Sequence, residues 1–170
     1  MPFVSNRTGS LCLLILVVCL AAQNATAVIW VLNPANGRSY AETPVLADWH
    51  SGEAMAQSYG GHLATVRSQE ENDWLHVNFP DNLWIGLTDE NSEGNWQWSS
   101  GEPVTFLNWG SNEPNGGTNA NHAVINWHPN GQWNDWGNNS TIRALMEIPE
   151  PGVLHLLVAT AAGAILRRRR

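Results

Sequence analysis

Two short motifs at the ends of residues 113–135 carry side chains that could bind a metal ion. The first is Glu113-Pro114-Asn115, and the second is Trp133-Asn134-Asp135. Together they supply two carboxylates and two amide oxygens, and no other charged side chain lies between them. Calcium takes about six to eight oxygen ligands from carboxylates, amides, backbone carbonyls and water. The window therefore predicts a calcium-binding loop.

Tryptophans near this loop are candidates for a second kind of contact. All ten tryptophans lie between Trp30 and Trp136. Most are expected in the core, where a large aromatic side chain buries much apolar area. Exposed tryptophans also stack on sugar rings, and Trp127 and Trp136 lie close to the predicted loop in sequence. These two are therefore the candidate ligand platform.

Helices and strands must hold the two motifs in place. A helix is predicted over residues 48–59, with Asp48 as N-cap and an apolar face that ends at Tyr59. A second begins at Ser68, where Ser68 and Glu71 match a capping box, and Val77 is expected on its apolar surface. β-strand patterns are expected at residues 28–32, 83–87, 96–98, 124–127, 131–133 and 142–148.

The composition limits the possible partners. The 170 residues suit one domain with terminal extras. Residues 28–148 hold three arginines, no lysine and fourteen acidic residues, a formal charge of about −11. Nucleic-acid binding depends on neutralising phosphates with Lys and Arg. The sequence thus argues against a nucleic-acid partner and favours cations and neutral ligands, although much of this charge is also what a surface needs for solubility.

The N-terminus resembles an export signal. Residues 1–27 combine Arg7, an apolar run from Leu11 to Ala22 and the small-x-small sequence Ala25-Thr26-Ala27, which together predict a signal peptide. A transmembrane anchor is the alternative. Both cysteines, Cys12 and Cys19, fall inside this segment. The mature domain is therefore expected to fold without disulfides.

A set of further motifs resembles the C-type lectin-like domain over residues 28–148. The resemblance implies an α+β fold with two helices flanking small antiparallel sheets and a long calcium-binding loop. The matching residues are the helix with Trp49 and Ala56, residues 60–66, the helix of residues 68–79, Trp84-Ile85-Gly86-Leu87-Thr88-Asp89, Trp109, both motifs of the loop, and Met146-Glu147.

The resemblance also assigns roles in the loop. It implies that Glu113, Asn115, Asn134 and Asp135 bind calcium together with two adjacent hydroxyls of a mannose-type sugar. The same four side chains would hydrogen-bond those hydroxyls, and the Glu113–Pro114 peptide bond would be cis. The fifth ligand position of the family is Asn121, which has an amide where a glutamate is common.

Three departures from the family pattern concern charge and cross-links. Asn121 leaves the site with a formal charge of −2, which predicts weak calcium binding. An auxiliary calcium site is matched by Asp89 and Glu93, but Gly116 and His122 stand where its acidic partners would be. The two family disulfides are replaced by other residues, Ala56 with Met146 and Ala123 with Asn138.

The C-terminus resembles a bacterial sorting signal. Residues 149–170 contain Pro149-Glu150-Pro151, an apolar stretch from Gly152 to Leu166 and four arginines, an order similar to the PEP-CTERM signal of Gram-negative bacteria. That resemblance implies processing by an exosortase-type enzyme, membrane association before processing, and a link to exopolysaccharide. A plain membrane anchor is the alternative.

Two functions follow from these patterns. The first is an exported or cell-surface lectin that binds a mannose-type glycan through one calcium ion. The second is a non-catalytic structural or adhesion module of the extracellular matrix that binds neither calcium nor sugar. An enzyme is not expected, because the six histidines are scattered and no nucleophile elbow or phosphate loop occurs.

Overall fold

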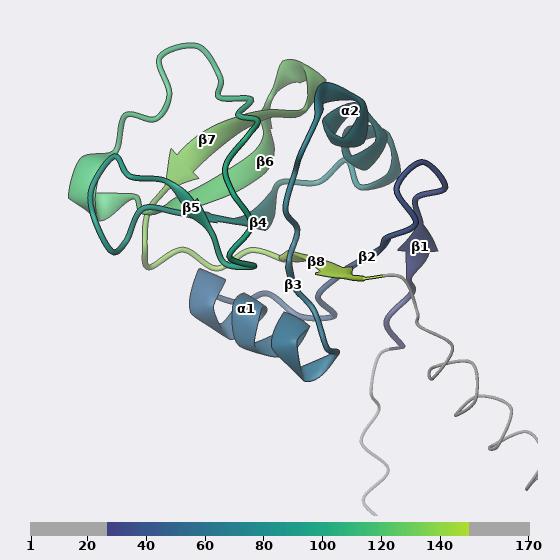
Figure 1. Cartoon of the computed structure of the whole chain (residues 1–170). Helices are drawn as coiled ribbons and strands as arrows, with labels where there is room; N and C mark the ends of the chain where they lie inside the picture. The colour runs from purple at the N-terminus through teal and green to yellow at the C-terminus, as the bar shows by residue number, and fades with distance from the viewer. Residues whose placement is uncertain (1–26, 150–170) are drawn as a thin grey trace, which may run out of the picture.

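The computed structural model describes residues 27–149. They form the predicted α+β fold, with two helices and two four-stranded antiparallel sheets (Figure 1). The ends of the described chain lie on the same side of the molecule, beside β1 and β8. The signal segment at 1–27 and the sorting segment at 149–170 lie outside the described residues, apart from Ala27 and Pro149. Among the described helices, none has the length and apolar character needed to cross a membrane.

Helix α1 (Trp49–Ser58) starts where its capping residue predicts. The Asp48 carboxylate accepts a hydrogen bond from the Ser51 backbone N–H at 2.8 Å, satisfying an N–H that has no partner within the helix. Trp49, Gly52 and Ala56 are buried on its inner face. Tyr59 was expected to extend this face, but the helix has ended by then and the Tyr59 side chain is 42% exposed.

Helix α2 (Gln69–Asn78) is capped by Ser68, whose hydroxyl accepts from the Glu71 N–H at 3.2 Å. The Glu71 carboxylate also reaches back to a backbone N–H, as the capping box predicts, but to a different one from the standard pattern. The Glu71 carboxylate accepts from the Arg67 N–H at 2.7 Å instead of the Ser68 N–H. Val77 is also not on the apolar surface, since it is 76% exposed, whereas Leu75 is fully buried.

The first sheet has the order β1-β2-β8-β3 and joins the ends of the domain. The predicted strand at 28–32 is shorter than expected, because only its last two residues pair with β2. The close approach of β3 and β8 requires a glycine, since a Cβ on Gly61 would lie 1.9 Å from the Glu147 carbonyl oxygen. The strands are β1 (Val31–Leu32), β2 (Ser39–Glu42), β3 (His62–Leu63) and β8 (Leu145–Ile148).

The second sheet has the order β5-β4-β6-β7, and its strand β7 carries the Asn134-Asp135 end of the candidate site. Its β6–β7 register pairs Ala123 with Asp135 and Val124 with Asn134. Short 3-10 turns at Gly117–Asn119 and Pro129–Gly131 precede β6 and β7. The strands are β4 (Leu83–Thr88), β5 (Gln97–Trp98), β6 (His122–His128) and β7 (Gln132–Trp136).

The core forms without covalent links between elements, because the described residues contain no cysteine. Ala56 of α1 and Met146 of β8 are both fully buried and belong to one hydrophobic cluster. At the other position, Ala123 is buried, while the Asn138 side-chain oxygen accepts from the Asn121 N–H at 2.8 Å. Apolar packing and a loop hydrogen bond therefore occupy the positions where the family resemblance places disulfides.

Candidate functional site

Strand β7 fixes one end of the loop. The Trp133 N–H donates to the Asn108 carbonyl at 2.8 Å, and the Gly110 N–H donates to the Trp133 carbonyl at 2.8 Å. These bonds hold the segment that leads into Glu113 against β7. The two motifs at the ends of the predicted loop are therefore brought together in space.

The Asp135 carboxylate directly links the two motifs. One oxygen accepts from the Asn115 N–H at 2.9 Å, and the other accepts from the Gly116 N–H at 2.7 Å. The Glu113–Pro114 peptide bond is cis, as predicted. Gly116 is needed here because a Cβ at this position would lie 2.2 Å from the Ala120 Cβ. The backbone on both sides of Asn115 is thus set by its contact with β7.

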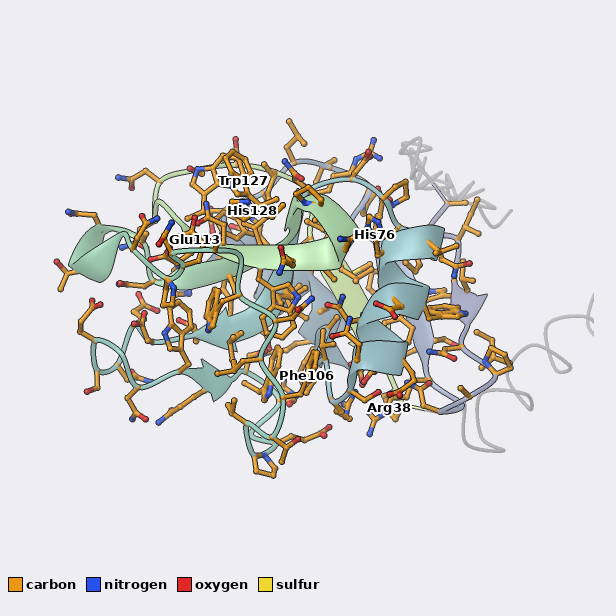
Figure 2. All side chains as sticks on the ribbon, turned by 90° about the horizontal axis from the view of Figure 1, so that it is seen from above. Arg38, His76, Phe106, Glu113, Trp127 and His128 are labelled. Atoms are coloured by element: carbon orange, nitrogen blue, oxygen red, sulfur yellow. The ribbon has the colours of Figure 1, made fainter. Side chains whose placement is uncertain are left out.

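The Glu113 carboxylate is buried and only half satisfied. Its side chain is 7% exposed, and Oε1 lies 3.2 Å from His128 Nε2. The other oxygen, Oε2, is buried and has no hydrogen-bond partner among the described residues. In Figure 2, Glu113, His128 and Trp127 lie together at one edge of the molecule. Sequence analysis missed His128, because its contact with Glu113 depends on the irregular register between β6 and β7.

This arrangement fits a hard cation. A buried polar oxygen without a partner is costly, since burial removes its hydrogen bonds to water. A carboxylate has about four lone-pair sites, so Asp135 retains acceptor capacity beyond its two backbone bonds. Glu113, Asn115, Asn134 and Asp135 are thus the residues that would hold calcium. The ion would supply positive charge and open coordination positions for hydroxyl oxygens.

Asn121 lies just before β6, and its hydrogen bonds to other described residues all use its backbone. Its carbonyl accepts from the Thr88 hydroxyl at 2.8 Å and from the Asp89 N–H at 3.2 Å. Its N–H donates to the Asn138 side chain. The fifth ligand position is therefore firmly placed by its backbone, but it offers a neutral amide where a carboxylate would add charge.

Trp127 and Trp136 form an aromatic pair beside this site. Their ring centroids lie 4.2 Å apart at an interplanar angle of 65°. Trp136 is half-buried and also packs edge-on against Trp84. Trp127 is 41% exposed. It directly precedes His128, the residue that contacts Glu113, and lies beside both in Figure 2. The exposed ring of Trp127 is therefore available to an external ligand.

The two candidate residues of the auxiliary site differ in their surroundings. Asp89 is buried, its Oδ2 accepts from the Gly94 N–H at 2.8 Å, and its Oδ1 has no partner among the described residues. Glu93 is exposed. His122, at an expected acidic position, is buried against Trp49, and burial lowers its pKa to about 4. A neutral imidazole thus stands where a second anion would be needed.

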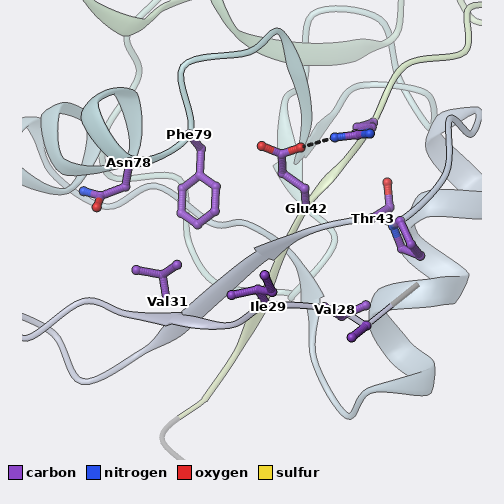
Figure 3. Close-up of a pocket in the computed structure, with 10 residues that line it drawn as sticks. Val28, Ile29, Val31, Glu42, Thr43, Asn78 and Phe79 are labelled. Carbon is purple, nitrogen blue, oxygen red and sulfur yellow. Dashed lines mark hydrogen bonds and ion pairs between the residues drawn. The ribbon is translucent and has the colours of Figure 1, made fainter. Parts of the chain in front are cut away.

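A pocket of about 290 Å³ lies elsewhere, between β1, β2 and the end of α2 (Figure 3). Val31 and Phe79 contribute apolar walls, and Glu42 pairs with Arg143 at its rim at 3.0 Å. It shares no residue with the Glu113–Asp135 site. The pocket therefore contributes nothing to the predicted calcium chemistry.

The curated proteins most relevant to this site include a lectin and a receptor. Lectin BRA-3 of Megabalanus rosa is 35% identical over 118 residues, covering 67% of this chain and 73% of the relative. The low affinity immunoglobulin epsilon Fc receptor of Mus musculus is 40% identical over 89 residues, but only 26% of that receptor is covered. These relatives are named as a lectin and a receptor, and they carry no enzyme name.

Solved structures share the fold. The cow CD23 carbohydrate-recognition domain, determined in the presence of a GlcNAc2Man3 oligosaccharide, has a TM-score of 0.63 and 25% identity, covering 71% of this chain and 92% of that chain. A calcium-independent type II antifreeze protein has a TM-score of 0.66 at 22% identity, covering 74% and 98%. The family model of the Lectin C-type domain matches residues 46–145. The chain therefore belongs to the C-type lectin domain family, which is non-catalytic and includes carbohydrate-binding lectins.

Proposed function

We propose that this chain is an exported lectin that binds a mannose-type glycan through one calcium ion. The observation that carries the proposal is the buried Glu113 carboxylate, whose Oε2 has no partner among the described residues. Its neighbour Asn115 is fixed by the hydrogen bond to Asp135. A cation at Glu113 and Asp135 satisfies the orphaned oxygen and joins the two motifs.

Sugar recognition follows from the chemistry of the four ligands. Glu113 and Asp135 can only accept hydrogen bonds, whereas the amides of Asn115 and Asn134 can donate them. Two adjacent hydroxyls that share the ion can therefore each hydrogen-bond to the ligand side chains. Trp127 and Trp136 supply an aromatic surface beside those hydroxyls. CD23 was crystallised with a mannose-containing oligosaccharide, which supports this sugar class.

The second candidate is a non-catalytic adhesion module that uses neither calcium nor sugar. Asn121 favours this alternative, because it leaves the site one carboxylate short. The calcium-independent antifreeze protein has the same fold. Calcium dependence is therefore the property that separates the two candidates.

We also propose the location from the two ends of the sequence. Residues 1–27 serve as a signal peptide, and residues 149–170 serve as a PEP-CTERM-type segment for an exosortase-type enzyme. The chain is then held at the membrane by this tail before processing and afterwards lies at the cell surface or is secreted. In this setting, exopolysaccharide is a natural source of the glycan. A mass spectrum of the exported protein that ends at Arg170 would contradict processing.

Chromatography on mannose resin tests the function. The chain should be retained in calcium and released by a chelator, and Glu113→Gln should pass through. Asp81→Asn, which removes an exposed carboxylate outside both candidate calcium sites, is the control and should be retained. Passage of the unaltered chain, together with a thermal melt that calcium does not shift, would contradict the lectin and support the adhesion module.

A double substitution tests separately whether Glu113 and Asn115 select the pair of sugar hydroxyls that binds. Glu113→Gln with Asn115→Asp keeps one carboxylate in the motif but moves it. We expect retention to shift from mannose resin to galactose resin, because the donors and acceptors change places. A folded variant that still prefers mannose would exclude Glu113 and Asn115 as the residues that read the hydroxyls.

A further inference from the structure

Three side chains from different elements converge away from the calcium ligands. His50 lies in α1, Glu90 follows β4, and His122 begins β6. One ligand atom from each lies within 4.8 Å of the other two. Glu90 Oε1 is 3.1 Å from His50 Nε2, and Glu90 Oε2 is 3.7 Å from His122 Nε2. Two imidazoles thus face the two oxygens of one carboxylate.

His122 indicates that this convergence is more than a surface ion pair. Its side chain is 2% exposed, and both ring nitrogens lack a hydrogen-bond partner among the described residues. The imidazole stacks on Trp49, with ring centroids 4.6 Å apart at 22°. Trp84 packs against it edge-on. The ring is therefore fixed in direction while its nitrogens stay unsatisfied, which is unusual for a buried polar group.

The geometry and ligand types favour a transition ion over calcium. Zinc binds imidazole nitrogen and carboxylate oxygen at ~2.0–2.2 Å, so ligand atoms of a tetrahedral site lie about 3.3 Å apart. Each imidazole nitrogen lies near this separation from one oxygen of Glu90, with Oε1 at 3.1 Å from His50 and Oε2 at 3.7 Å from His122. The His50 side chain is 60% exposed, so its ring has room to move until its nitrogen lies at the same separation from the His122 nitrogen. Calcium instead prefers oxygen ligands, and imidazole suits zinc, copper and nickel.

We propose that His50, Glu90 and His122 form a site for a divalent transition ion of the zinc type. Three protein ligands leave a fourth position for water. Glu90, at 45% exposed, and His50 open the site to solvent, whereas His122 anchors it to the core. The site uses none of Glu113, Asn115, Asn134 and Asp135. It shares with the auxiliary site only position 122, where His122 replaces an acidic residue.

A zinc titration tests the site. The chain should be untagged, and Cys12 and Cys19 should be replaced by serine, because thiols also bind zinc. Calorimetry with zinc chloride should show one ion per chain. Replacing zinc with cobalt should give the intense visible absorption bands of a tetrahedral ion, which report its coordination geometry.

Two exposed ligands provide variants that leave the core intact. His50→Ala and Glu90→Gln should each weaken zinc binding at least about tenfold, since loss even of a residue that supports a ligand costs 10–100-fold. Asp81→Asn removes an exposed carboxylate that belongs to neither metal site, and this control should bind zinc as the parent does. The Glu113→Gln variant should also retain zinc, which separates this site from the proposed calcium site.

Three results would overturn the site. These are the absence of zinc binding in the parent chain, unchanged affinity in both His50→Ala and Glu90→Gln, and a comparable loss in Glu113→Gln. The last result would place the zinc on Glu113 and its neighbour His128.

Discussion

At the scale of single residues, Arg67 gathers three carboxylates. Its guanidinium lies 3.0 Å from Glu71, 2.6 Å from Glu102 and 2.8 Å from Glu147. Glu71 and Glu147 are buried, so these carboxylates depend on the cation for compensation. Arg67 therefore ties the start of α2 to β8.

Arg67→Met tests this dependence. The change keeps much of the side-chain volume but leaves two buried carboxylates with less compensation, and we expect a loss of about 2–4 kcal/mol in the free energy of unfolding. Arg143→Met is the control, since its pair with Glu42 is exposed and should matter by less than about 1 kcal/mol. Urea denaturation measures both. Equal losses in the two variants would argue against the Arg67 network.

Glu53 is a second residue with a measurable signature. Burial alone would raise its pKa, but hydrogen bonds from the Leu63 N–H, His62, Gln57 and Ser99 outweigh that effect, and the net pKa is lowered. A carboxyl whose pKa is lower in the folded state stabilises the fold above its unfolded pKa, near 4.5. That contribution is lost as the pH falls through the folded pKa.

Glu53→Gln should therefore be less stable than the parent at neutral pH and should lose less stability on acidification. Urea midpoints measured from neutral pH to below the unfolded pKa provide the comparison. Asp73→Asn is a control, because Asp73 is exposed and has only a helix-surface partner, Gln69. Parallel pH profiles for the parent and Glu53→Gln would exclude this role for Glu53.

At the scale of elements, the first sheet depends on a close backbone contact. The Glu147 carbonyl approaches Gly61 so closely that a Cβ there would lie 1.9 Å from it. Backbone atoms cannot move as a flexible side chain can. Strand β3 must therefore separate from β8 if any side chain is added.

Gly61→Ala should lower the free energy of unfolding by about 3 kcal/mol, at the upper end of overpacking costs. Gly137→Ala is the control, since a Cβ there meets its nearest atom at 3.6 Å, an ordinary contact. Thermal melts of the two variants make the comparison. If the two variants have the same melting temperature, the backbone at Gly61 does not lie as close to the Glu147 carbonyl as the 1.9 Å Cβ distance implies.

The sequence predicted where helices begin more reliably than it predicted contacts between residues far apart in the chain. Asp48 and Ser68 located both helix starts, because capping is decided within one turn. Val77 was misplaced, since the α2 face that packs is set by tertiary contacts and not by hydrophobicity alone. The ends of the candidate site follow from two motifs in the sequence. The His128 contact to Glu113 does not, because it needs the irregular β6–β7 register.

At the scale of the whole molecule, packing replaces cross-links. Ala56 and Met146 are buried in the same cluster, although they belong to α1 and β8 and are far apart in sequence. Their position predicts that a disulfide would fit there. It would close a long loop, which is where cross-links restrict the unfolded chain most.

Ala56→Cys with Met146→Cys, in a chain whose Cys12 and Cys19 are replaced by serine, should form this disulfide. We expect oxidation to raise the free energy of unfolding by about 2–4 kcal/mol relative to the reduced form. Thermal melts with and without reductant measure the difference, and thiol titration measures cross-linking. Two thiols that stay free after oxidation would contradict the packing of α1 on β8.

The central claim is that one calcium ion, held by Glu113, Asn115, Asn134 and Asp135, mediates the binding of a mannose-type sugar. Calorimetric titration of methyl α-mannoside into the purified chain tests it most directly. The account predicts binding in calcium, none in chelator, and none in a folded Glu113→Gln variant. Mannoside binding that persists in chelator or in Glu113→Gln would contradict it.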